Sequence, residues 1–511
     1  MAPSQDPVVI IGGGPAGLTA AYELTRHGVL PLVLEQDVRY VGGLARTVRF
    51  KDFRFDIGGH RFFSKSQEIE RLWEEICGDD LIGRTRVSRI FYRGRFFNYP
   101  LSARNALGQL GAIESAVCIA SYLRYRAAPI RPEVSFQDWV TNRFGRRLFE
   151  IFFRTYTEKV WGMPCHEISA NWASQRIKGL SLRSAILQAV LPRGNHDGAP
   201  SIKTLATSFR YPRLGPGMMW ERVRDRVAEA GGQVSMGCDV IQVHHQGGLV
   251  HDVVVRRPDQ TTERIPGRAF ISSMPLRSLI LRWTPSPPPD VIRAARALKY
   301  RDFIVVGLVL RVRDPFPDHW VYVHDPTVRL GRVQNFRAWS PDMAPAAGRS
   351  GLGLEYFCNR GDPLWAMADR DLIVLAAREL EQVKLARAAD VEDGCVLRVP
   401  KAYPVYDNGY EARVGVIRDY LGGFRNIQPV GRNGMHKYNN QDHSMMTALL
   451  AARNILGADL DPWAVNTDAQ YLEASDDAGK PAASRPDLGS WAREERQVPR
   501  TLSRCSARRH A

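Results

Sequence analysis

Short apolar runs and helical periodicity alternate at the start of the chain. Val8–Ile11 is an uninterrupted apolar run, apolar residues then recur at helical spacing from Leu18 to His27, and Pro31–Leu34 is a second short run. Buried parallel strands are typically continuous apolar runs, and a helix connects one such strand to the next. The pattern therefore predicts a strand–helix–strand unit that begins an α/β fold.

The pattern changes twice further along the chain. Residues 103–191 are helical in pattern, whereas residues 303–358 alternate strongly and are rich in Val, Leu, Tyr and Phe, which favours a mostly antiparallel sheet. The other predicted helices are 67–77, 218–229, 372–386 and 447–456. The other predicted strands are a hairpin at 87–99, a strand over 50–63 that ends at paired glycines, and strands at 233–243, 250–257 and 269–273. Inside the helical region we predict helices 103–125, 136–159 and 170–190.

A glycine-rich turn joins the first strand to the first helix. Its residues, Gly12-Gly13-Gly14-Pro15-Ala16-Gly17, match the GxGxxG spacing of dinucleotide sites. Gly12 makes the tight turn, Gly14 lets backbone amides approach a pyrophosphate, and Gly17 lets the helix press on the sheet. Glu35 ends the next strand, where a carboxylate accepts from a ribose 2′-hydroxyl and repels a 2′-phosphate. The sequence thus favours FAD or NAD over NADP.

Composition narrows the class of partner. At 511 residues the chain is long enough for two or three structural units, and its net charge of +16 with a pI near 9.7 suggests an anionic partner. RNP, zinc-finger and helix-turn-helix signatures are missing from the sequence, so we expect no nucleic acid and favour a phosphorylated small molecule.

Cysteine usage and the chain start suggest a cytoplasmic protein. The seven cysteines are scattered and never in CxxC spacing, which is typical of free thiols in a reducing cytosol, and we expect no metal site. The first strand starts at residue 8, which leaves no room for a signal peptide. The most apolar helix candidate, 108–125, is interrupted by Glu114 and Ser115, so we expect no transmembrane helix. The sequence is compatible with a homo-oligomer.

A second glycine pair connects the chain to a known superfamily. Gly42-Gly43-Leu44-Ala45-Arg46-Thr47 follows Glu35 at a spacing similar to that in the amine oxidase, protoporphyrinogen oxidase and UDP-galactopyranose mutase superfamily of flavoproteins. The resemblance implies FAD, with Gly43, Leu44 and Ala45 beside it. It also implies an α/β fold in which a Rossmann-like FAD-binding domain carries a helical insertion and an antiparallel β-sheet layer.

The resemblance gives expected domain limits. The FAD-binding domain takes residues 1–86, 201–290 and 406–466; the sheet domain takes a hairpin at 87–101 and residues 291–405; and the helical substrate domain takes 102–200. Residues 467–511 lack apolar periodicity and are rich in Ser, Asp, Gly, Pro and Arg. We expect a disordered tail there.

Five stretches resemble UDP-galactopyranose mutases specifically. They are Gly58-Gly59-His60-Arg61-Phe62-Phe63; Tyr92-Arg93-Gly94-Arg95-Phe96-Phe97-Asn98-Tyr99-Pro100; Tyr156-Thr157-Glu158-Lys159-Val160-Trp161-Gly162; Leu298-Lys299-Tyr300-Arg301; and Gly431-Arg432-Asn433-Gly434 with Tyr438 to Asp442. By resemblance, Tyr156 stacks on a nucleobase with Phe153 as a second wall, and Trp161 lines the sugar pocket. An aromatic core stripe at helical spacing is the alternative.

The same resemblance assigns catalytic and substrate-binding groups. Arg176 and Arg301 would grip a diphosphate from two sides, although an isolated arginine is more often a solvated surface group. His60, with Gly59, would lie by the flavin N5, although it is equally well a structural histidine. Tyr403 would reach the phosphates, or would simply end a strand. Tyr438 belongs to the same substrate set.

The resemblance implies further flavin-contacting residues, and at two places the sequence departs from the mutase pattern. Val240 would lie by the adenine, and the remaining flavin contacts would be Gly431, Arg432, Asp442, His443, Ser444 and Met445, with Asp442 also a candidate helix N-cap. Asn335-Phe336 stands where mutases have Asn-Tyr, so Phe336 would face the diphosphate without a hydroxyl. Residues 181–187 lack the tyrosine expected after the first arginine. These departures leave the nucleobase open, with a GDP-hexose beside the UDP-galactose typical of the family.

The implied reaction interconverts an NDP-hexopyranose and an NDP-hexofuranose. In the family, N5 of the reduced flavin forms an adduct with the sugar and expels the nucleoside diphosphate, and NAD(P)H or another donor supplies the electrons. Two rival hypotheses remain: a FAD-dependent oxidase or desaturase of the amine oxidase or protoporphyrinogen oxidase type, and a nucleotide-sugar or flavin-binding module without catalysis.

Overall fold

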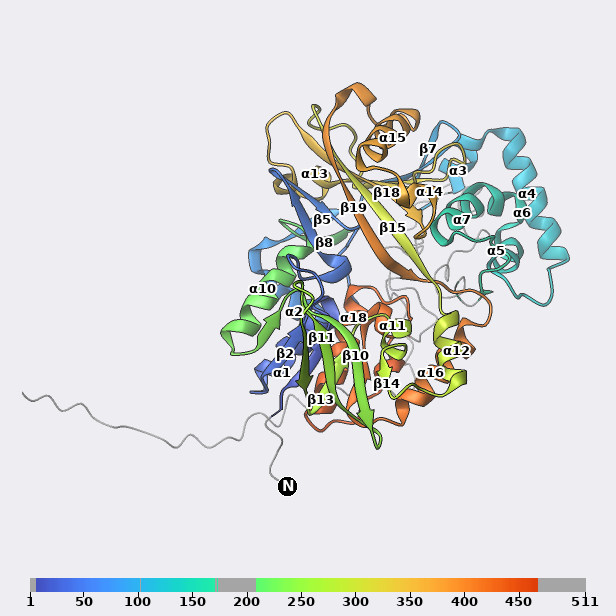
Figure 1. Cartoon of the computed structure of the whole chain (residues 1–511). Coiled ribbons are helices and arrows are strands. Elements are labelled where there is room, and N and C mark those ends of the chain that lie inside the picture. The colour runs from blue at the N-terminus through green and yellow to red at the C-terminus, as the bar shows by residue number, and fades with distance from the viewer. Residues whose placement is uncertain (1–5, 102, 171, 173–207, 467–511) are drawn as a thin grey trace, which may run out of the picture. The chain divides into compact units, whose positions relative to one another are not determined.

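A parallel sheet holds the N-terminal strand at its centre (Figure 1). The computed structural model describes residues 6–101, 103–170, 172 and 208–466. The sheet has the order β20-β13-β1-β2-β9, and all its neighbours are parallel. Its strands are β1 (Val8–Ile11), β2 (Pro31–Leu34), β9 (Gln233–Ser235), β13 (Ala269–Ser272) and β20 (Ile427–Pro429).

Both faces of this sheet are covered, because alternate residues of β1 enter two different cores. Val8 and Ile10 pack with one set of helices, and Val9 and Ile11 pack with the elements on the other face. The first set is α1 (Pro15–Arg26), α2 (Gln67–Cys77), α10 (Pro216–Glu229) and α18 (Gln441–Ile455). The second set is α11 (Leu276–Ile280), α12 (Pro289–Ala297) and α16 (Tyr410–Gly422), with the sheet β12-β11-β10-β14. The strands of that sheet are β10 (Asp239–Gln246), β11 (Leu249–Arg256), β12 (Thr262–Pro266) and β14 (Trp283–Thr284).

The glycine turn after β1 brings α1 directly onto the sheet. A Cβ on Gly17 would lie 1.8 Å from the carbonyl oxygen of Gly12, so only glycine allows the first turn of α1 to lie against the turn. Gly12 itself has φ of +103°, in the region that favours glycine. The glycine spacing therefore fixes where α1 begins.

A seven-stranded sheet is formed mainly by the later part of the chain. Its order is β19-β15-β18-β17-β16-β6-β7, and its neighbours are antiparallel except for β16 and β6. The strands are β6 (Ser88–Tyr92), β7 (Arg95–Asn98), β15 (Tyr300–Leu310), β16 (Trp320–Val323), β17 (Arg332–Asn335), β18 (Ser350–Cys358) and β19 (Val391–Pro404). Figure 1 shows β15 and β19 side by side, with α13 (Phe336–Trp339), α14 (Pro363–Ala366) and α15 (Asp369–Gln382) near this sheet.

A group of helices adjoins the β7 end of that sheet (Figure 1). They are α3 (Ala103–Leu110), α4 (Ala112–Ala127), α5 (Phe136–Phe144), α6 (Arg146–Phe149) and α7 (Thr155–Trp161). Periodicity predicted two long helices here, but Gly111 (φ +86°) and Gly145 (φ +81°) interrupt them. An apolar pattern continues through such breaks, so the pattern alone could not locate them.

Further elements complete the described chain. They are the hairpin β3 (Thr47–Phe50) and β4 (Phe53–Asp56), the pair β5 (Leu81–Thr85) and β8 (Ser208–Pro212), and the short helix α17 (Gly431–Gly434). The strand expected within residues 50–63 ends before Gly58-Gly59 as predicted, because β4 stops at Asp56, but it begins only at Phe53, because Lys51 turns the chain with a φ of +52°. Most of the predicted helix 170–190 and the tail 467–511 lie outside the described residues.

The predicted α/β fold class is confirmed by the two kinds of sheet and the helices between them. The expected domain limits stay a prediction. Within the described ranges, every helix is too short or too polar to cross a bilayer.

Replacing Gly17 with alanine tests how strictly α1 must approach the turn. The added Cβ meets backbone, which cannot move aside, so we expect Gly17→Ala to destabilise the fold by about 3 kcal/mol. Thermal unfolding measures this. Gly415→Ala in α16 is the matched control, since a Cβ there meets open space and should stabilise by about 0.5–1 kcal/mol. Equal melting temperatures for the two variants would contradict the close-approach argument.

Candidate active site

A cavity lies where the loop after β4, the loop before α18 and strands of the seven-stranded sheet meet. Residues 57–61 and 63, residues 440–442, and the ends of the long strands border it. Its lining contains three arginines (Arg61, Arg332 and Arg432), three tyrosines (Tyr322, Tyr403 and Tyr438), and one carboxylic acid, Asp442. Leu44, Ile57, Trp73 and Phe303 add apolar surface. The cavity is thus polar and cationic on one side and apolar beside the glycine motifs.

The acid predicted to contact a ribose lies against the glycine turn. Glu35 accepts hydrogen bonds from the backbone N–H groups of Gly13, at 2.6 Å, and Asp37, at 2.8 Å. Its side chain is buried, and burial raises its pKa. Cys238, two residues before Val240, donates its N–H to the Glu35 carbonyl at 2.7 Å. The ribose and adenine contacts of these residues stay predictions.

The two glycine motifs approach each other at the start of α1. A Cβ on Gly14 would lie 3.7 Å from the Cα of Gly43, and Gly14 precedes α1 without a side-chain cap. The first-turn amides of α1, including those of Ala16 and Gly17, therefore lack helical acceptors. Free amides at a helix start, with no side chain in the way, fit a pyrophosphate. This observation makes the site suitable for a dinucleotide cofactor such as FAD.

His60 borders the cavity as predicted, and it is electrically neutral near pH 7. Its Nε2–H donates to the carbonyl of Ile57 at 2.9 Å. Burial lowers its pKa to about 4. His60 therefore presents no positive charge beside the ring site at physiological pH.

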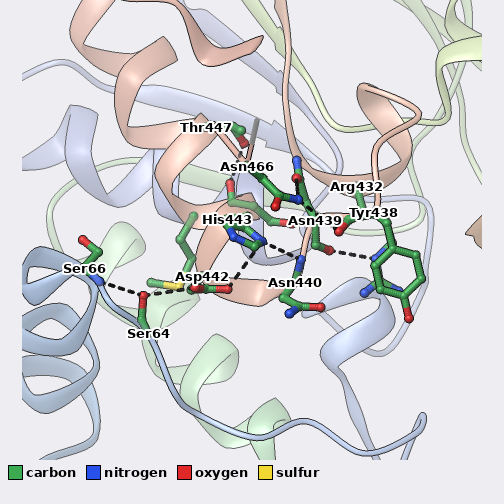
Figure 2. A network of polar contacts seen from close by, with 12 residues as sticks. Ser64, Ser66, Arg432, Tyr438, Asn439, Asn440, Asp442, His443, Thr447 and Asn466 are labelled. Atoms are coloured by element: carbon green, nitrogen blue, oxygen red, sulfur yellow. Dashed lines mark hydrogen bonds and ion pairs between the residues drawn. The ribbon is translucent and has the colours of Figure 1, made fainter. Parts of the chain in front are cut away.

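The start of α18 carries a linked set of polar groups (Figure 2). Asp442 accepts from the hydroxyl of Ser64 at 3.0 Å, and burial raises its pKa to about 6. His443 Nδ1 accepts from the N–H of Asn440 at 3.2 Å. The helix begins at Gln441 with Asn440 as N-cap, so the predicted start at Thr447 and the N-cap assignment of Asp442 are wrong. An apolar pattern that starts at Met445 had hidden the polar first turn.

The loop before α18 is held by amide side chains. Asn439 donates to the carbonyl of Gly431 at 3.0 Å, and Arg432 Nε donates to the carbonyl of Asn439 at 2.8 Å. Asn466 reaches back to the Tyr438 carbonyl at 3.3 Å and to the Asn439 side chain at 3.1 Å. These bonds hold Arg432 and Tyr438 at the cavity wall (Figure 2).

A buried ion pair that the sequence did not reveal supports the cationic side. Arg332 of β17 pairs with Glu355 of β18, with nitrogen–oxygen distances of 2.7 and 2.5 Å. Gln334 donates to the other oxygen of Glu355 at 2.8 Å. Burial lowers the pKa of Arg332, but Glu355 and the hydroxyls of Tyr156, Tyr403 and Tyr322 together raise it by more, so the net pKa lies above its ordinary value. Gly58 and Gly59 pass beside this group, and a Cβ on Gly59 would lie 2.9 Å from the Gln334 amide.

Arg301 does not line this cavity. Its guanidinium donates to the carbonyls of Val160, Lys159 and Phe357 at 3.2, 3.3 and 3.0 Å, and lies 3.9 Å from Asp362. It is buried, and its contact with a diphosphate stays a prediction. The carbonyls at the C-terminal end of α7 need donors, and Arg301 supplies them. Arg176, the other predicted arginine, lies outside the described residues.

The predicted aromatic residues divide between cavity and core. Tyr403 and Tyr438 line the cavity and stack at 5.9 Å between ring centroids. Trp161 is buried and contacts Tyr403 edge-on at 6.4 Å, and Tyr156 stacks on His324 at 4.9 Å. Neither of these two lines the cavity.

Three further predicted contacts lie in packed surroundings. Phe336 is fully buried and meets Phe55 edge-on at 5.7 Å, so its assignment to the diphosphate site is wrong. Phe153 stacks near Phe144 at 5.4 Å, away from the lining. The Met445 side chain accepts from Trp73 Nε1 at 3.2 Å in the core, which leaves only its backbone for a cofactor.

The sequence matches a described family over most of its length. Residues 15–408 match the model described as flavin containing amine oxidoreductase. The chain belongs to this family. It is therefore a flavin-dependent enzyme of the amine oxidase superfamily, and the glycine turn, Glu35 and the apolar side of the cavity are where its residues fit that cofactor.

The fold resembles that of a solved member of the wider superfamily. A reduced UDP-galactopyranose mutase superposes with a TM-score of 0.76 over 92% of this chain and all of that chain, at 24% sequence identity. At this identity the likeness shows the fold alone.

Curated relatives match only in part. A Dictyostelium discoideum protein named "Probable flavin-containing monoamine oxidase A" is 35% identical over 69 residues, which are 14% of this chain and 15% of the relative. An Oncorhynchus mykiss flavin-containing amine oxidase is 36% identical over 94 residues, 18% of each chain. The chain thus matches less than a fifth of the length of either relative.

The raised pKa of Asp442 predicts that the stability of the fold depends on pH. In the unfolded chain this carboxyl ionises near 3.8, whereas the fold keeps it protonated to about 6. The fold therefore binds the proton more tightly, and wild-type stability should fall as pH rises from 4 to 6, by up to about 3 kcal/mol. Asp442→Asn keeps an acceptor for Ser64 but does not titrate. Its melting temperature should exceed that of wild type increasingly from pH 4 to 6 and by a constant amount above pH 7. A difference independent of pH would refute the shifted carboxyl.

Proposed function

We propose that this flavin-dependent enzyme is a nucleotide-sugar mutase that interconverts an NDP-hexopyranose and an NDP-hexofuranose, with UDP-galactose or a GDP-hexose as substrate. The observation that carries the proposal is the lining of the cavity beside Gly59 and His60. Three guanidinium groups and three tyrosines face it, against one carboxylic acid, Asp442, whose pKa burial raises to about 6. Such a wall suits a diphosphate, which arginine binds through paired charge-assisted hydrogen bonds.

The same lining argues against an amine as substrate. An ammonium group brought beside Arg432, which is supported by tyrosine rings and a backbone carbonyl, meets a like charge in a partly buried site, where Coulomb repulsion is stronger than in water. Oxidation of a large apolar substrate would instead call for an apolar route to the ring. The family description and the names of the curated relatives still favour an oxidase, which is the second candidate.

The residues of this chain would bind and position the substrate. Arg332 is oriented by Glu355, and Arg432 lies over the rings of Tyr403 and Tyr438 at 5.6 and 4.5 Å. Groups fixed in advance stabilise the charge of a departing diphosphate without reorganising. Burial raises the pKa of Tyr403, so its hydroxyl stays protonated and can donate to a phosphate oxygen.

The flavin would be held by the glycine turn, Glu35 and the first turn of α18. When bound in its reduced form, it supplies the nucleophilic and electron-donating chemistry that the side chains lack. We propose NAD(P)H or another small donor as the source of its electrons. The neutral His60 leaves the ring site free of a cation that would compete for the diphosphate.

A product analysis decides between the two candidates. Enzyme reduced with dithionite and incubated with UDP- and GDP-hexoses should yield furanose products, whereas oxidised enzyme should yield none. Chromatographic separation of pyranose from furanose forms measures this. Stoichiometric hydrogen peroxide release from an amine or porphyrinogen, with no furanose product, would establish the oxidase instead.

Two arginines on one indole provide a matched test of the cationic wall. Arg61 and Arg86 both lie 5.2 Å from the ring centroid of Trp320, but only Arg61 is among the lining residues. Arg61→Gln should weaken binding of UDP or GDP to the holoenzyme about tenfold, as loss of one charge-assisted hydrogen bond implies. Arg86→Gln should change the dissociation constant less than about twofold, because it removes a similar indole contact without touching the cavity. Equal effects would count against a diphosphate at this wall.

A further inference from the structure

Gln441 lines the cavity but belongs to neither the glycine motifs nor the set of arginines. It is the first residue of α18, and its side chain lies between the cavity and the indole of Trp220 in α10. The Gln441 Oε1 accepts from Trp220 Nε1 at 3.2 Å. An indole nitrogen can only donate, so the amide oxygen must face Trp220 and the amide nitrogen must face the other way. The orientation of this amide is therefore determined by its neighbour.

Trp220 is itself held in place. It is fully buried in the core beneath the parallel sheet, and a Cβ on Gly42 would lie 3.2 Å from its Cδ1 atom. The indole thus lies against the same Gly42-Gly43 turn that faces the start of α1. Rotation of Trp220 would need the glycine turn to move, so the hydrogen bond to Gln441 is sterically fixed.

The amide nitrogen of Gln441 is left as a buried donor. Within the described part of the chain, Nε2 is shielded from solvent and has no hydrogen-bond acceptor. A donor without a partner is costly, and native structures almost always satisfy such groups by protein, water or ligand. Asp442 and Leu44, its neighbours in the lining, belong to the stretches that resemble flavin-binding motifs.

We propose that the Gln441 carboxamide donates a hydrogen bond to an oxygen acceptor of the flavin, and that Trp220 is the positioning residue that aims it. The pair connects the cavity lining at Gln441 to the turn at Gly42. This role does not depend on the reaction that the enzyme catalyses, because a mutase and an oxidase would hold the same cofactor.

Flavin affinity in a double-mutant cycle tests the pair. Gln441→Met keeps the length of the side chain without a donor and should raise the FAD dissociation constant of the diluted holoenzyme at least tenfold, followed by the fluorescence of released flavin. Trp220→Phe should raise it less, about threefold, because the freed amide can still reach the flavin in some orientations. The double variant should have the same FAD dissociation constant as Gln441→Met alone, since Trp220 acts through Gln441.

Gln428→Met is the matched control. The Gln428 amide donates to the carbonyl of Ala451 at 3.2 Å and does not border the cavity, so this variant should keep the wild-type dissociation constant. Thermal unfolding of each variant reports whether it is folded. If Gln441→Met does not fold, Gln441→Glu takes its place, because a carboxylate still accepts from Trp220 and cannot donate. Wild-type FAD affinity in either Gln441 variant, or additive effects in the cycle, would overturn the proposal.

Discussion

The close approach of two glycine-containing turns is the constraint on which this structure depends. A Cβ on Gly43 would lie 3.2 Å from the Cα of Gly14, and Gly17 allows α1 to begin directly at the turn after β1. A side chain on Gly17 would push α1 from the sheet, and one on Gly43 would press on the turn before the free amides of α1. The second turn lies against Trp220 through Gly42, and the first is braced by the Glu35 carboxylate. Cofactor site, helix position and the first turn of α18 are therefore parts of one packed arrangement.

The structure also holds two arginine side chains, Arg332 and Arg432, in fixed positions at the edge of the cavity. Arg332 is stabilised by Glu355, which is fully buried and accepts from Gln334 as well. The three donors satisfy a carboxylate that would otherwise be costly to bury. Arg432 has a different support, since it lies over two tyrosine rings and donates to a loop carbonyl. These supports fix the two guanidinium groups before any ligand arrives.

Family membership and local chemistry bear on different questions. The match to flavin-containing amine oxidoreductases establishes the cofactor class and the superfamily, whereas one superfamily fold hosts several reactions. The substrate must be inferred from the wall that faces it. That wall contains three arginines and three tyrosines, and this composition is the basis on which we propose an activated sugar diphosphate rather than an amine.

The sequence by itself determined the features that depend on the spacing of nearby residues. The glycine turn, Glu35, the β6–β7 hairpin and helix α2 could be predicted because each depends on residues close together in the chain. His60, Tyr403 and Tyr438 at the cavity were also anticipated, by resemblance. Only the tertiary structure decided which strand arginine lines the cavity. Arg301 and Arg332 both lie at the start of a strand, β15 and β17, and their surroundings differ because one meets the carbonyl end of α7 and the other meets Glu355 across β17 and β18. Strand register and helix placement set these encounters, and neither is encoded in the spacing of a single segment.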